Sequence, residues 1–345
     1  MVTLKWQSAK RLATWVEEAS PALNGAAEAL VRPLMVASCD LDVAAVRGQV
    51  PLAGEWAVGH EGVAEVVEVG SDVTGVKPGD RVVVPFQLSC GGCRACRRGL
   101  TGSCIFVPDR AMYGLAPIAG LDGGGFLSDL VRVPFADAML VTIPSGVDAA
   151  ALVSASDNLV DGWRCVGPYA RELAALDPAD RRVLVLGGLS IGLYAAAVAV
   201  ALGVRVDYVD TDQERLAIAE RLGAKPIEWR ADGSGLKPAY PVTASTSPTV
   251  EALHTGLRST WPGGVCTDTG IFFSNLTPMP LLELYGTGII FMTGRVMARA
   301  MLPEVIGLVE EGSLNPVPVT AQTVTWGDAD TVWPAMTGKT VFVRR

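Results

Sequence analysis

Short apolar runs separated by glycine and proline follow one another between residues 29 and 144. Runs such as 62–69 and 81–85 contain many β-branched side chains, which pack well on a pleated sheet. Two of these runs, 66–73 and 76–84, flank a turn-rich link and predict two paired or neighbouring strands. This part of the chain is therefore expected to form a β-rich domain.

The pattern changes after Pro144, where an alanine-rich stretch begins and helical periodicity alternates with apolar strands. From residue 183 we expect a strand, a glycine turn and a helix to 202, then a strand at 204–209 and a helix at 213–222. Further strands are expected near 241–245, 264–269 and 288–292. Such alternation predicts parallel strands joined by crossover helices. The tail, with a helix at 301–311 and a strand-like segment at 317–324, is expected to return to the first domain.

A chain of 345 residues is too long for one ordinary core and suits two domains. We place a β-rich domain in 1–148 and 295–345, and a parallel-sheet domain in 149–294. Half of the residues are apolar and 19% are charged, which is typical of a compact α/β protein. The uncharged run 183–204 is long enough to span a membrane, but Gly187, Gly188 and Gly192 favour a buried strand, turn and helix.

The charge balance limits the classes of partner. A net charge of −8 disfavours binding to nucleic acid or to an anionic membrane, because phosphates are repelled on average. The N-terminal residues lack a basic stretch followed by an apolar core, so we expect no secretion signal and a cytoplasmic location.

Four of the seven cysteines crowd into one short segment, at Cys90, Cys93, Cys96 and Cys104. In a reducing compartment such a group indicates a metal site before disulfides. Four thiolates suit tetrahedral zinc and leave no position for substrate, so this zinc is expected to be structural.

A second set of metal-binding side chains lies upstream, at Cys39, Asp42, His60 and Glu61. A single cysteine and a single histidine are weak evidence by themselves. In order along the chain, however, Cys39-Asp40-Leu41-Asp42, Gly59-His60-Glu61, the four-cysteine loop and a later glycine-rich turn resemble the medium-chain zinc alcohol dehydrogenases over nearly the whole chain.

The resemblance implies a GroES-like catalytic domain, a Rossmann domain with a doubly wound parallel sheet, and two zinc ions per chain. It implies Cys39 and His60 as ligands of a catalytic zinc, with Asp42 behind the histidine to orient its ring. Asp157, in the frame Asp157-Asn-Leu-Val-Asp-Gly-Trp, matches the third ligand, and Glu61 is a neighbour that can touch or exchange with the metal. A Cys, His, Asp site with an open fourth position suits a Lewis-acid zinc acting on an alcohol or carbonyl oxygen.

The glycine-rich turn after the first strand of the second domain is a near match to Gly-x-Gly-x-x-Gly. It comprises Gly187, Gly188, Leu189, Ser190, Ile191 and Gly192, with Leu189 in place of the middle glycine. Asp210, 23 residues after Gly187, is expected to hold the ribose hydroxyls and to favour NAD over NADP. Arg215 is either a solvated helix residue or an adenosine contact, and Asp161 replaces the usual threonine beside the nicotinamide.

Other residues near these motifs have less certain roles. Phe86 resembles a pocket-wall position of the family, and Trp56 and Trp163 lie close in sequence to the ligands. Cys165 competes with Asp157 as a ligand, but a buried, packed thiol is the better interpretation of this residue. His254 is expected to be a surface or packed imidazole.

Family members commonly carry serine or threonine at the position of Leu41, where it begins a hydroxyl relay for the alcohol proton. Without that hydroxyl, the proton leaves through water or Glu61, or the reaction does not need the relay. We therefore expect NAD-linked oxidation of an alcohol, or reduction of a conjugated carbonyl or iminium with NADH or NADPH. A dinucleotide-binding protein that has lost catalysis is a third possibility, given Leu41, Asp161 and Leu189. The expected partners are a small alcohol or carbonyl substrate and further copies of the chain, in a homodimer or homotetramer.

Overall fold

The computed structural model describes residues 1–229, 238–274 and 276–344. The chain divides into two compact units. Unit 1 comprises Met1–Val160, Val296–Glu310 and Thr320–Arg345, and unit 2 comprises Asp161–Arg295 and Glu311–Val319. Segment 149–160, predicted to belong with the second domain, falls in unit 1 by this division.

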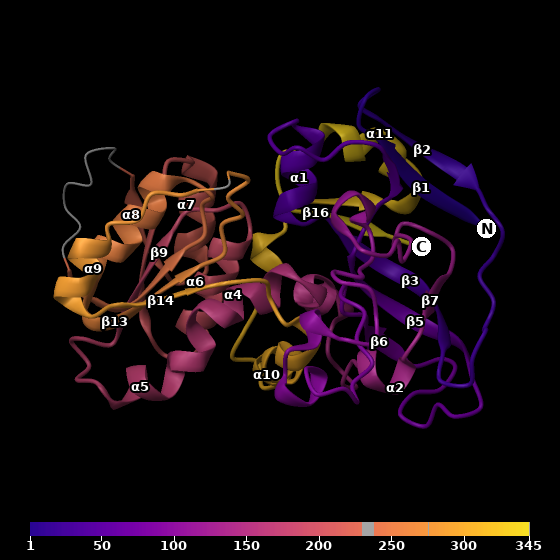
Figure 1. Cartoon of the computed structure of the whole chain (residues 1–345), viewed down its shortest axis with the longest axis horizontal. Coiled ribbons are helices and arrows are strands. Elements are labelled where there is room, and N and C mark those ends of the chain that lie inside the picture. Colours follow the sequence, from indigo (N-terminus) through magenta and orange to yellow (C-terminus); the bar gives the residue numbers. More distant parts are fainter. Residues whose placement is uncertain (230–237, 275, 345) are drawn as a thin grey trace. The chain divides into compact units, whose positions relative to one another are not determined.

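Unit 1 is built around a seven-stranded sheet that gathers strands from both ends of the chain (Figure 1). Its order is β15 (Gln322–Thr325), β16 (Thr340–Val343), β3 (Ala29–Ala37), β5 (Glu61–Val69), β6 (Arg81–Val83) and β8 (Val141–Thr142), with β7 (Val131–Val133) also paired to β3. β5 and β6 pair antiparallel, in the region where two adjacent strands are expected. A smaller sheet contains β2 (Leu12–Glu17), β1 (Val2–Gln7) and β4 (Glu55–Ala57), which lie outside the predicted β-rich runs or between them.

The helices of unit 1 are mostly short and connect strands. They are α1 (Asp40–Val46), α2 (Ala136–Met139), α3 (Ala149–Leu152), α10 (Ala298–Glu310) and α11 (Ala329–Val332). The predicted strand at 317–324 is wrong in its first half, because Val317–Val319 forms a 3-10 turn. Pro316 and Pro318 have no amide hydrogen to give to a ladder, so pairing begins only at Gln322.

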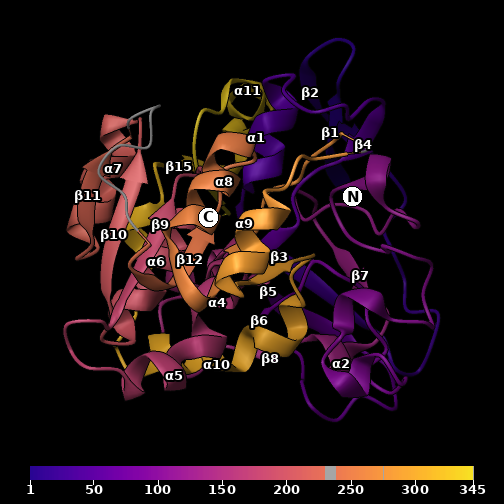
Figure 2. The same cartoon turned by 60° about the vertical axis from the view of Figure 1, so that its left-hand side comes forward.

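Unit 2 contains a six-stranded sheet in which every pair of neighbouring strands is parallel. The order is β11 (Lys225–Glu228), β10 (Arg205–Asp210), β9 (Arg182–Leu186), β12 (Tyr240–Ser245), β13 (Thr260–Asp268) and β14 (Ile290–Thr293), and Figure 2 shows its first four strands. This is the doubly wound Rossmann order, in which the first strand is central and the chain winds outward on both sides. The helices are α4 (Asn158–Val166), in which the division between the units falls, α5 (Ala170–Ala175), α6 (Ile191–Ala201), α7 (Gln213–Arg221), α8 (Val250–Ser259) and α9 (Leu281–Thr287).

The uncharged run 183–204 forms β9, a glycine turn and α6, as predicted. Residues Val183–Leu186 and most of α6 are buried, which explains why the run carries no charge. No helix within the described residues combines the length and apolarity needed to cross a membrane.

Candidate metal and dinucleotide sites

The four clustered cysteines meet in unit 1. Their sulfur atoms lie within 4.8 Å of one another, and Cys93, Cys96 and Cys104 are buried. Gly91 and Gly99 adopt positive φ angles of 71° and 77°, which lets the loop turn tightly around the sulfurs. The amides of Cys96 and Ile105 lower the pKa of the Cys93 thiol to about 6, so one ligand is prepared as a thiolate.

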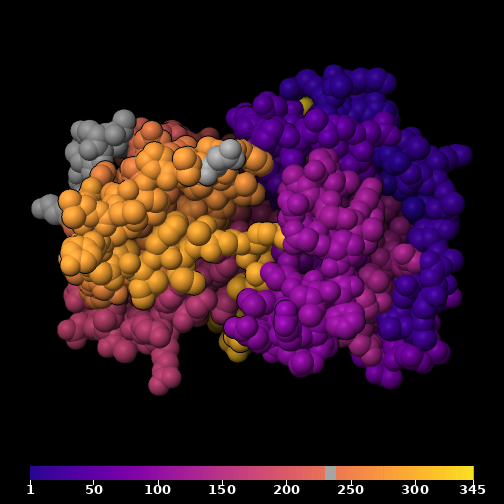
Figure 3. Space-filling model, in the orientation of Figure 1, coloured from indigo at the N-terminus to yellow at the C-terminus, as the bar shows by residue number. Residues whose placement is uncertain are grey.

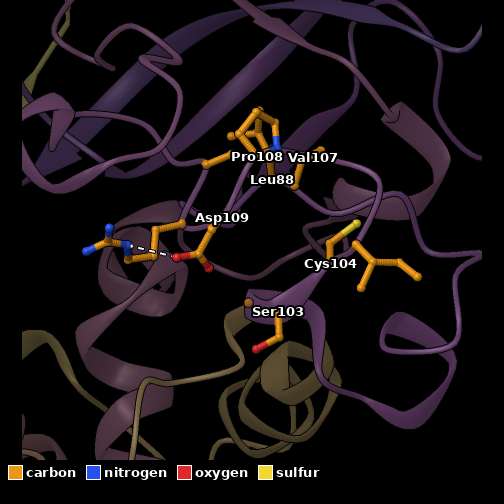
Figure 4. Close-up of a pocket in the computed structure, with 10 residues that line it drawn as sticks. Leu88, Ser103, Cys104, Val107, Pro108 and Asp109 are labelled. Atoms are coloured by element: carbon orange, nitrogen blue, oxygen red, sulfur yellow. Dashed lines mark hydrogen bonds and ion pairs between the residues drawn. The ribbon is translucent and has the colours of Figure 1, made fainter.

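A pocket of about 350 Å³ lies beside this loop, next to Cys104 (Figure 4). Leu88, Val107 and Pro108 form its apolar wall, and Asp109 pairs with Arg110 at 3.1 Å on its polar side. Neither Cys39, His60 nor Asp157 lines it. The pocket is therefore a feature of the cysteine loop and not of the second metal-binding group.

That second group is also formed in unit 1, where ligand atoms of Cys39, His60, Glu61 and Asp157 lie within 4.8 Å of one another. The first three side chains are buried, and Asp157 is 13% exposed. The His60 ring contacts Asp157 through Nε2, with 3.3 Å between Nε2 and Oδ2. Residues separated by almost 120 positions in the sequence thus converge on one point.

Cys39 is placed by the start of α1, which it caps. The Asp42 amide donates to its Sγ at 3.3 Å, and the Cys39 amide donates to the Asp42 carboxylate at 3.0 Å. Asp42 Oδ2 also lies 3.8 Å from His60 Nδ1, a buried nitrogen without a hydrogen bond in the described structure. Asp42 therefore stands behind the histidine, where a small movement makes the expected contact.

The donor set fits a divalent cation. Burial, together with the charges of Asp42, Asp157 and Glu61, holds the pKa of the Cys39 thiol well above its usual range. Burial raises the pKa of Glu61, and the neighbouring Lys339 ammonium opposes this shift. The pKa of His60 rises to about 9, because nearby carboxylates outweigh the opposing effect of burial. Several acidic groups buried in one place are unfavourable unless a positive charge lies near them. A divalent cation would supply that charge, and thiolate, imidazole and carboxylate are zinc ligands.

Lys339 supplies one such charge, and sequence reasoning missed it. Its Nζ donates to both oxygens of Glu61, at 2.9 and 2.7 Å, and is itself buried. The same ammonium donates to the Ser38 carbonyl and to Asn158 Oδ1. Asn158 in turn donates to Asp157 Oδ2 at 3.3 Å, which links the lysine to a candidate ligand. A lone lysine directly before the apolar strand β16 is the only signal of this role in the sequence.

Three further residues that the sequence analysis singled out near this group are Phe86, Trp56 and Leu41. Phe86 is buried beside the metal-binding histidine, with 5.5 Å between the ring centroids of Phe86 and His60. Trp56 is a core residue of the small sheet, paired with Trp6 across β1 and β4. Leu41 lies half-buried on α1, two residues after Cys39.

Cys165 and His254 stand apart from the candidate metal sites. The buried Cys165 thiol donates to the Asp161 carbonyl at 3.3 Å, as a packed cysteine does. His254 contacts the Pro278 carbonyl at the surface. Trp163, on α4, is half-buried.

In unit 2, the glycine-rich turn connects β9 to α6. Gly187 and Gly188 have φ angles of 62° and 91°, a conformation that disfavours other residues. A Cβ on Gly192 would lie 1.9 Å from the Gly187 carbonyl oxygen, so a glycine is required there as well. Leu189 is half-buried within the turn. The turn thus keeps the tight geometry of a phosphate-binding loop despite the missing middle glycine.

Asp210 ends β10 at the same edge of the sheet, and its carboxylate is already engaged. Arg215 binds it with two parallel hydrogen bonds, Nε to Oδ2 and Nη2 to Oδ1, both 2.7 Å. The Tyr208 hydroxyl and the amides of Thr211 and Asp212 also donate to it. Arg215 is therefore not a free surface residue. It neutralises the acid that was expected to receive the ribose.

Comparisons with known proteins agree with this combination of a cysteine-rich metal unit and a Rossmann unit. The alcohol dehydrogenase GroES-like domain matches residues 25–145. A medium chain reductase/dehydrogenase of Acremonium sp. is 36% identical over 194 residues, which cover 56% of this chain and 64% of that protein, so the match spans just under two thirds of the relative's length. The L-threonine 3-dehydrogenase of Streptomyces coelicolor is 30% identical over 263 residues, 72% of this chain and 71% of that enzyme. Among solved structures, the alcohol dehydrogenase TADH from Thermus sp. ATN1 superposes with a TM-score of 0.86 at 26% identity over the whole of both chains.

The structure thus combines a unit that gathers two groups of metal-ligating side chains with a unit of Rossmann topology, the architecture of the solved alcohol dehydrogenase. The chain belongs to the zinc-dependent medium-chain alcohol dehydrogenase family.

Proposed function

We propose that this protein transfers hydride between NAD(H) and a small alcohol or carbonyl compound, with one catalytic and one structural zinc per chain. The observation that carries the proposal is the buried group Cys39, His60, Glu61 and Asp157, set apart from the four-cysteine loop. When bound, zinc supplies Lewis acidity toward the substrate oxygen, and the nicotinamide ring supplies or accepts the hydride.

The protein residues hold and isolate this chemistry. Cys39, His60 and Asp157 would hold the catalytic metal, and Asp42, 3.8 Å from His60 Nδ1, would orient the histidine ring once it closes to hydrogen-bond distance. The site is largely buried, with Asp157 its most exposed member, and Phe86 packs against the histidine. In unit 2, the glycine turn would receive the pyrophosphate.

The proton route differs from the usual hydroxyl relay, because Leu41 offers no hydroxyl. Glu61 is a poor outlet to solvent, since it is fully buried and both its oxygens accept hydrogen bonds from Lys339. Water is therefore the proposed carrier for alcohol oxidation. The same apolar Leu41 supports a second candidate reaction, reduction of a conjugated carbonyl or iminium, in which hydride goes to carbon and the relay matters less.

We favour NAD because an acid ends β10, where it disfavours a second phosphate on the ribose. Arg215 opposes this preference by neutralising that acid. Steady-state kinetics with both cofactors test the proposal, and a higher kcat/KM with NADP would contradict it.

Metal analysis tests the catalytic site directly. The purified protein is expected to hold two zinc ions, and Cys39→Ser is expected to hold one, keep its fold and lose turnover. A wild-type protein with a single zinc after gentle purification would remove the catalytic half of the proposal. A panel of alcohols, aldehydes, enones and iminium compounds then separates the two candidate reactions.

We also propose that the chain forms a homodimer through β14. This strand lies at one edge of the sheet of unit 2, and the segment around it exposes large apolar side chains on a face drawn in orange (Figure 3). They are Ile271, Phe273, Leu276, Leu281, Leu282, Tyr285, Ile290 and Met292. An edge strand paired with its two-fold copy continues both sheets and covers such a surface. Light scattering should give twice the chain mass, and Tyr285→Glu should give monomers. A wild-type monomer would refute the dimer, and a tetramer would show that a second surface also associates.

A further inference from the structure

A buried side-chain amide in unit 1 joins segments that carry the candidate catalytic zinc ligands. Asn158, the first residue of α4, is 3% exposed. Its Oδ1 accepts from the Asp40 amide at 3.2 Å and from Lys339 Nζ at 2.9 Å, and its Nδ2 donates to Asp157 Oδ2 at 3.3 Å. Because Asp40 directly follows Cys39, this one side chain contacts three segments that lie far apart in the sequence.

The metal-binding group contains two carboxylates, and their partners differ. Ligand atoms of Glu61 and Asp157 lie within 4.8 Å of each other and of the remaining candidate ligands. Both oxygens of Glu61 accept hydrogen bonds from Lys339, at 2.9 and 2.7 Å. Asp157 uses its Oδ2 to contact His60 Nε2 and the side-chain nitrogen of Asn158. One acid is therefore paired with a lysine, and the other faces a histidine that is itself a candidate ligand.

The ammonium group of Lys339 has three N–H groups, and Asn158 occupies one of them. The others are directed to the Ser38 carbonyl, at 2.7 Å, and to the Glu61 carboxylate. A side chain without an acceptor at position 158 would leave one of these N–H groups unpaired in a buried place, which is unfavourable. The Asp157 carboxylate lies on the other side of the amide, so it is an acceptor toward which the released ammonium can turn.

A primary amide is suited to separate these two charged groups. An ammonium only donates hydrogen bonds and a carboxylate only accepts them, so the two would pair directly if nothing lay between them. Breaking a buried ion pair is strongly unfavourable, so such a pair would withdraw the carboxylate from a metal. The Asn158 amide gives its oxygen to the lysine and its N–H to the aspartate, and thus satisfies both without a direct ion pair.

We propose that Asn158 is a positioning residue of the catalytic zinc site, which holds Lys339 on Glu61 and so keeps Asp157 available as the third ligand. Asp157 needs such a partner because it lies between the 3-10 turn Val153–Ser156 and α4, where no regular helix fixes its position. Asn158 acts through Asp157 and does not itself bind the metal. The inference rests on the proposed catalytic zinc.

The test measures the zinc affinity of the catalytic site by competition with a chelator. Cys39→Ser, which is expected to keep only the structural zinc, gives the baseline for the four-cysteine loop. Asn158→Leu, with a side chain of similar size, should lower the affinity of the catalytic site by about tenfold, a usual effect of losing a hydrogen-bonding partner of a ligand. The structural zinc should be retained, which verifies the fold. Unchanged affinity of the catalytic site would overturn the inference.

A double-mutant cycle tests whether the amide acts by restraining the lysine. In a Lys339→Met background no ammonium competes for Asp157, so the further change Asn158→Leu should lower the zinc affinity by no more than about twofold. A loss of about tenfold in both backgrounds would show that the lysine is not involved, and would overturn the proposed role of Asn158.

Absorption of Co²⁺ bound in the catalytic site gives a second measurement, which does not depend on the folding of the Lys339→Met variant. In Asn158→Leu the d–d bands should shift, because Asp157 no longer binds the metal. The charge-transfer band of the Cys39 thiolate should persist, because that ligand is retained. A spectrum identical to that of the wild type would contradict the inference.

Gln87→Met is the matched control. Gln87 is 2% exposed and also joins two segments through its amide, which donates to the Val296 carbonyl and accepts from the Ala298 amide. These bonds end on backbone groups and not on candidate ligands, so Gln87→Met should keep the zinc affinity within about twofold of the wild type. Equal losses in Gln87→Met and Asn158→Leu would reveal a general effect of removing a buried amide and would overturn the positioning role. A wild type that holds a single zinc would instead overturn the proposed catalytic site itself.

Discussion

Replacing Asp268 by asparagine should stabilise the dinucleotide-free protein at neutral pH. The wild-type carboxylate is buried with one oxygen unpaired, and its ionisation in the folded state is unfavourable. Asparagine has nearly the same shape and keeps an oxygen for the Gly270 amide, but it carries no charge. The variant thus removes the unfavourable ionisation while leaving the packing intact.

The magnitude follows from the pKa, which rises from 3.8 in an unfolded chain to about 6 in the folded protein. Each pKa unit corresponds to roughly 1.4 kcal/mol, so ionisation of this one group destabilises the fold by about 3 kcal/mol. A raised carboxyl pKa costs nothing below the unfolded value, because both states are then protonated. The cost grows as pH rises from about 4 to 6 and is constant above the folded pKa.

Calorimetry or chemical denaturation of the zinc-loaded protein between pH 5 and 8 measures this difference. Asp268→Asn should gain on the wild type as pH rises to about 6 and then keep a constant advantage, of several degrees in Tm. An asparagine variant that is less stable at every pH, or a difference independent of pH, would refute the reasoning.

Four further outcomes are expected. Cys93→Ser should lower Tm and zinc content together, because binding of the structural metal contributes to folding; unchanged Tm with one zinc lost would contradict this role. Arg215→Leu should raise the kcat/KM preference for NAD over NADP by about tenfold, because Asp210 regains its repulsion of a phosphate. An unchanged ratio of the two kcat/KM values would show that Arg215 does not affect the choice of cofactor. Lys339→Met should lower the free energy of unfolding by about 3–5 kcal/mol, because it leaves the buried Glu61 carboxylate unpaired. Lys339→Arg keeps the positive charge and should lower the free energy of unfolding less. Equal losses in the two variants would show that packing and not charge matters. Leu41→Thr should increase alcohol oxidation in the metallated enzyme if a hydroxyl relay was lost, and unchanged kinetics would show that water already serves.

Local patterns predicted much of the fold. Alternating strands and helices after residue 183 indicated a doubly wound sheet, and the observed strand order has that topology. The four-cysteine spacing indicated a closed ligand set because its members lie within 15 residues of one another, a distance over which a loop fixes geometry. Pro316 and Pro318 indicate that a paired strand cannot begin at Val317, and a prediction based only on the β-branched residues of this segment missed that.

Interactions between distant segments could not be predicted. The hydrogen bond from Lys339 to Asn158 and the ion pair of Lys339 with Glu61 depend on how β16 lies in the sheet, and no spacing in the sequence encodes this. The unpaired oxygen of Asp268 is a property of packing around β13, since an acid at the end of a strand is ordinarily solvated. Arg215 and Asp210 are only five residues apart, yet their pairing required the turn between β10 and α7.

The bond between Lys339 and Glu61 joins residues 278 positions apart, so it can form only after almost all of the segment between them has been synthesised. When synthesis has reached the residue before Lys339, every candidate zinc ligand has already been made, yet Glu61 still lacks its counter-charge. The charge balance of this group is completed only when β16, the strand that follows Lys339, pairs with β3. A chain that stops before Lys339 would therefore rely on a bound cation to balance the charge of these buried acids, and its stability should depend more strongly on metal than that of the full sequence.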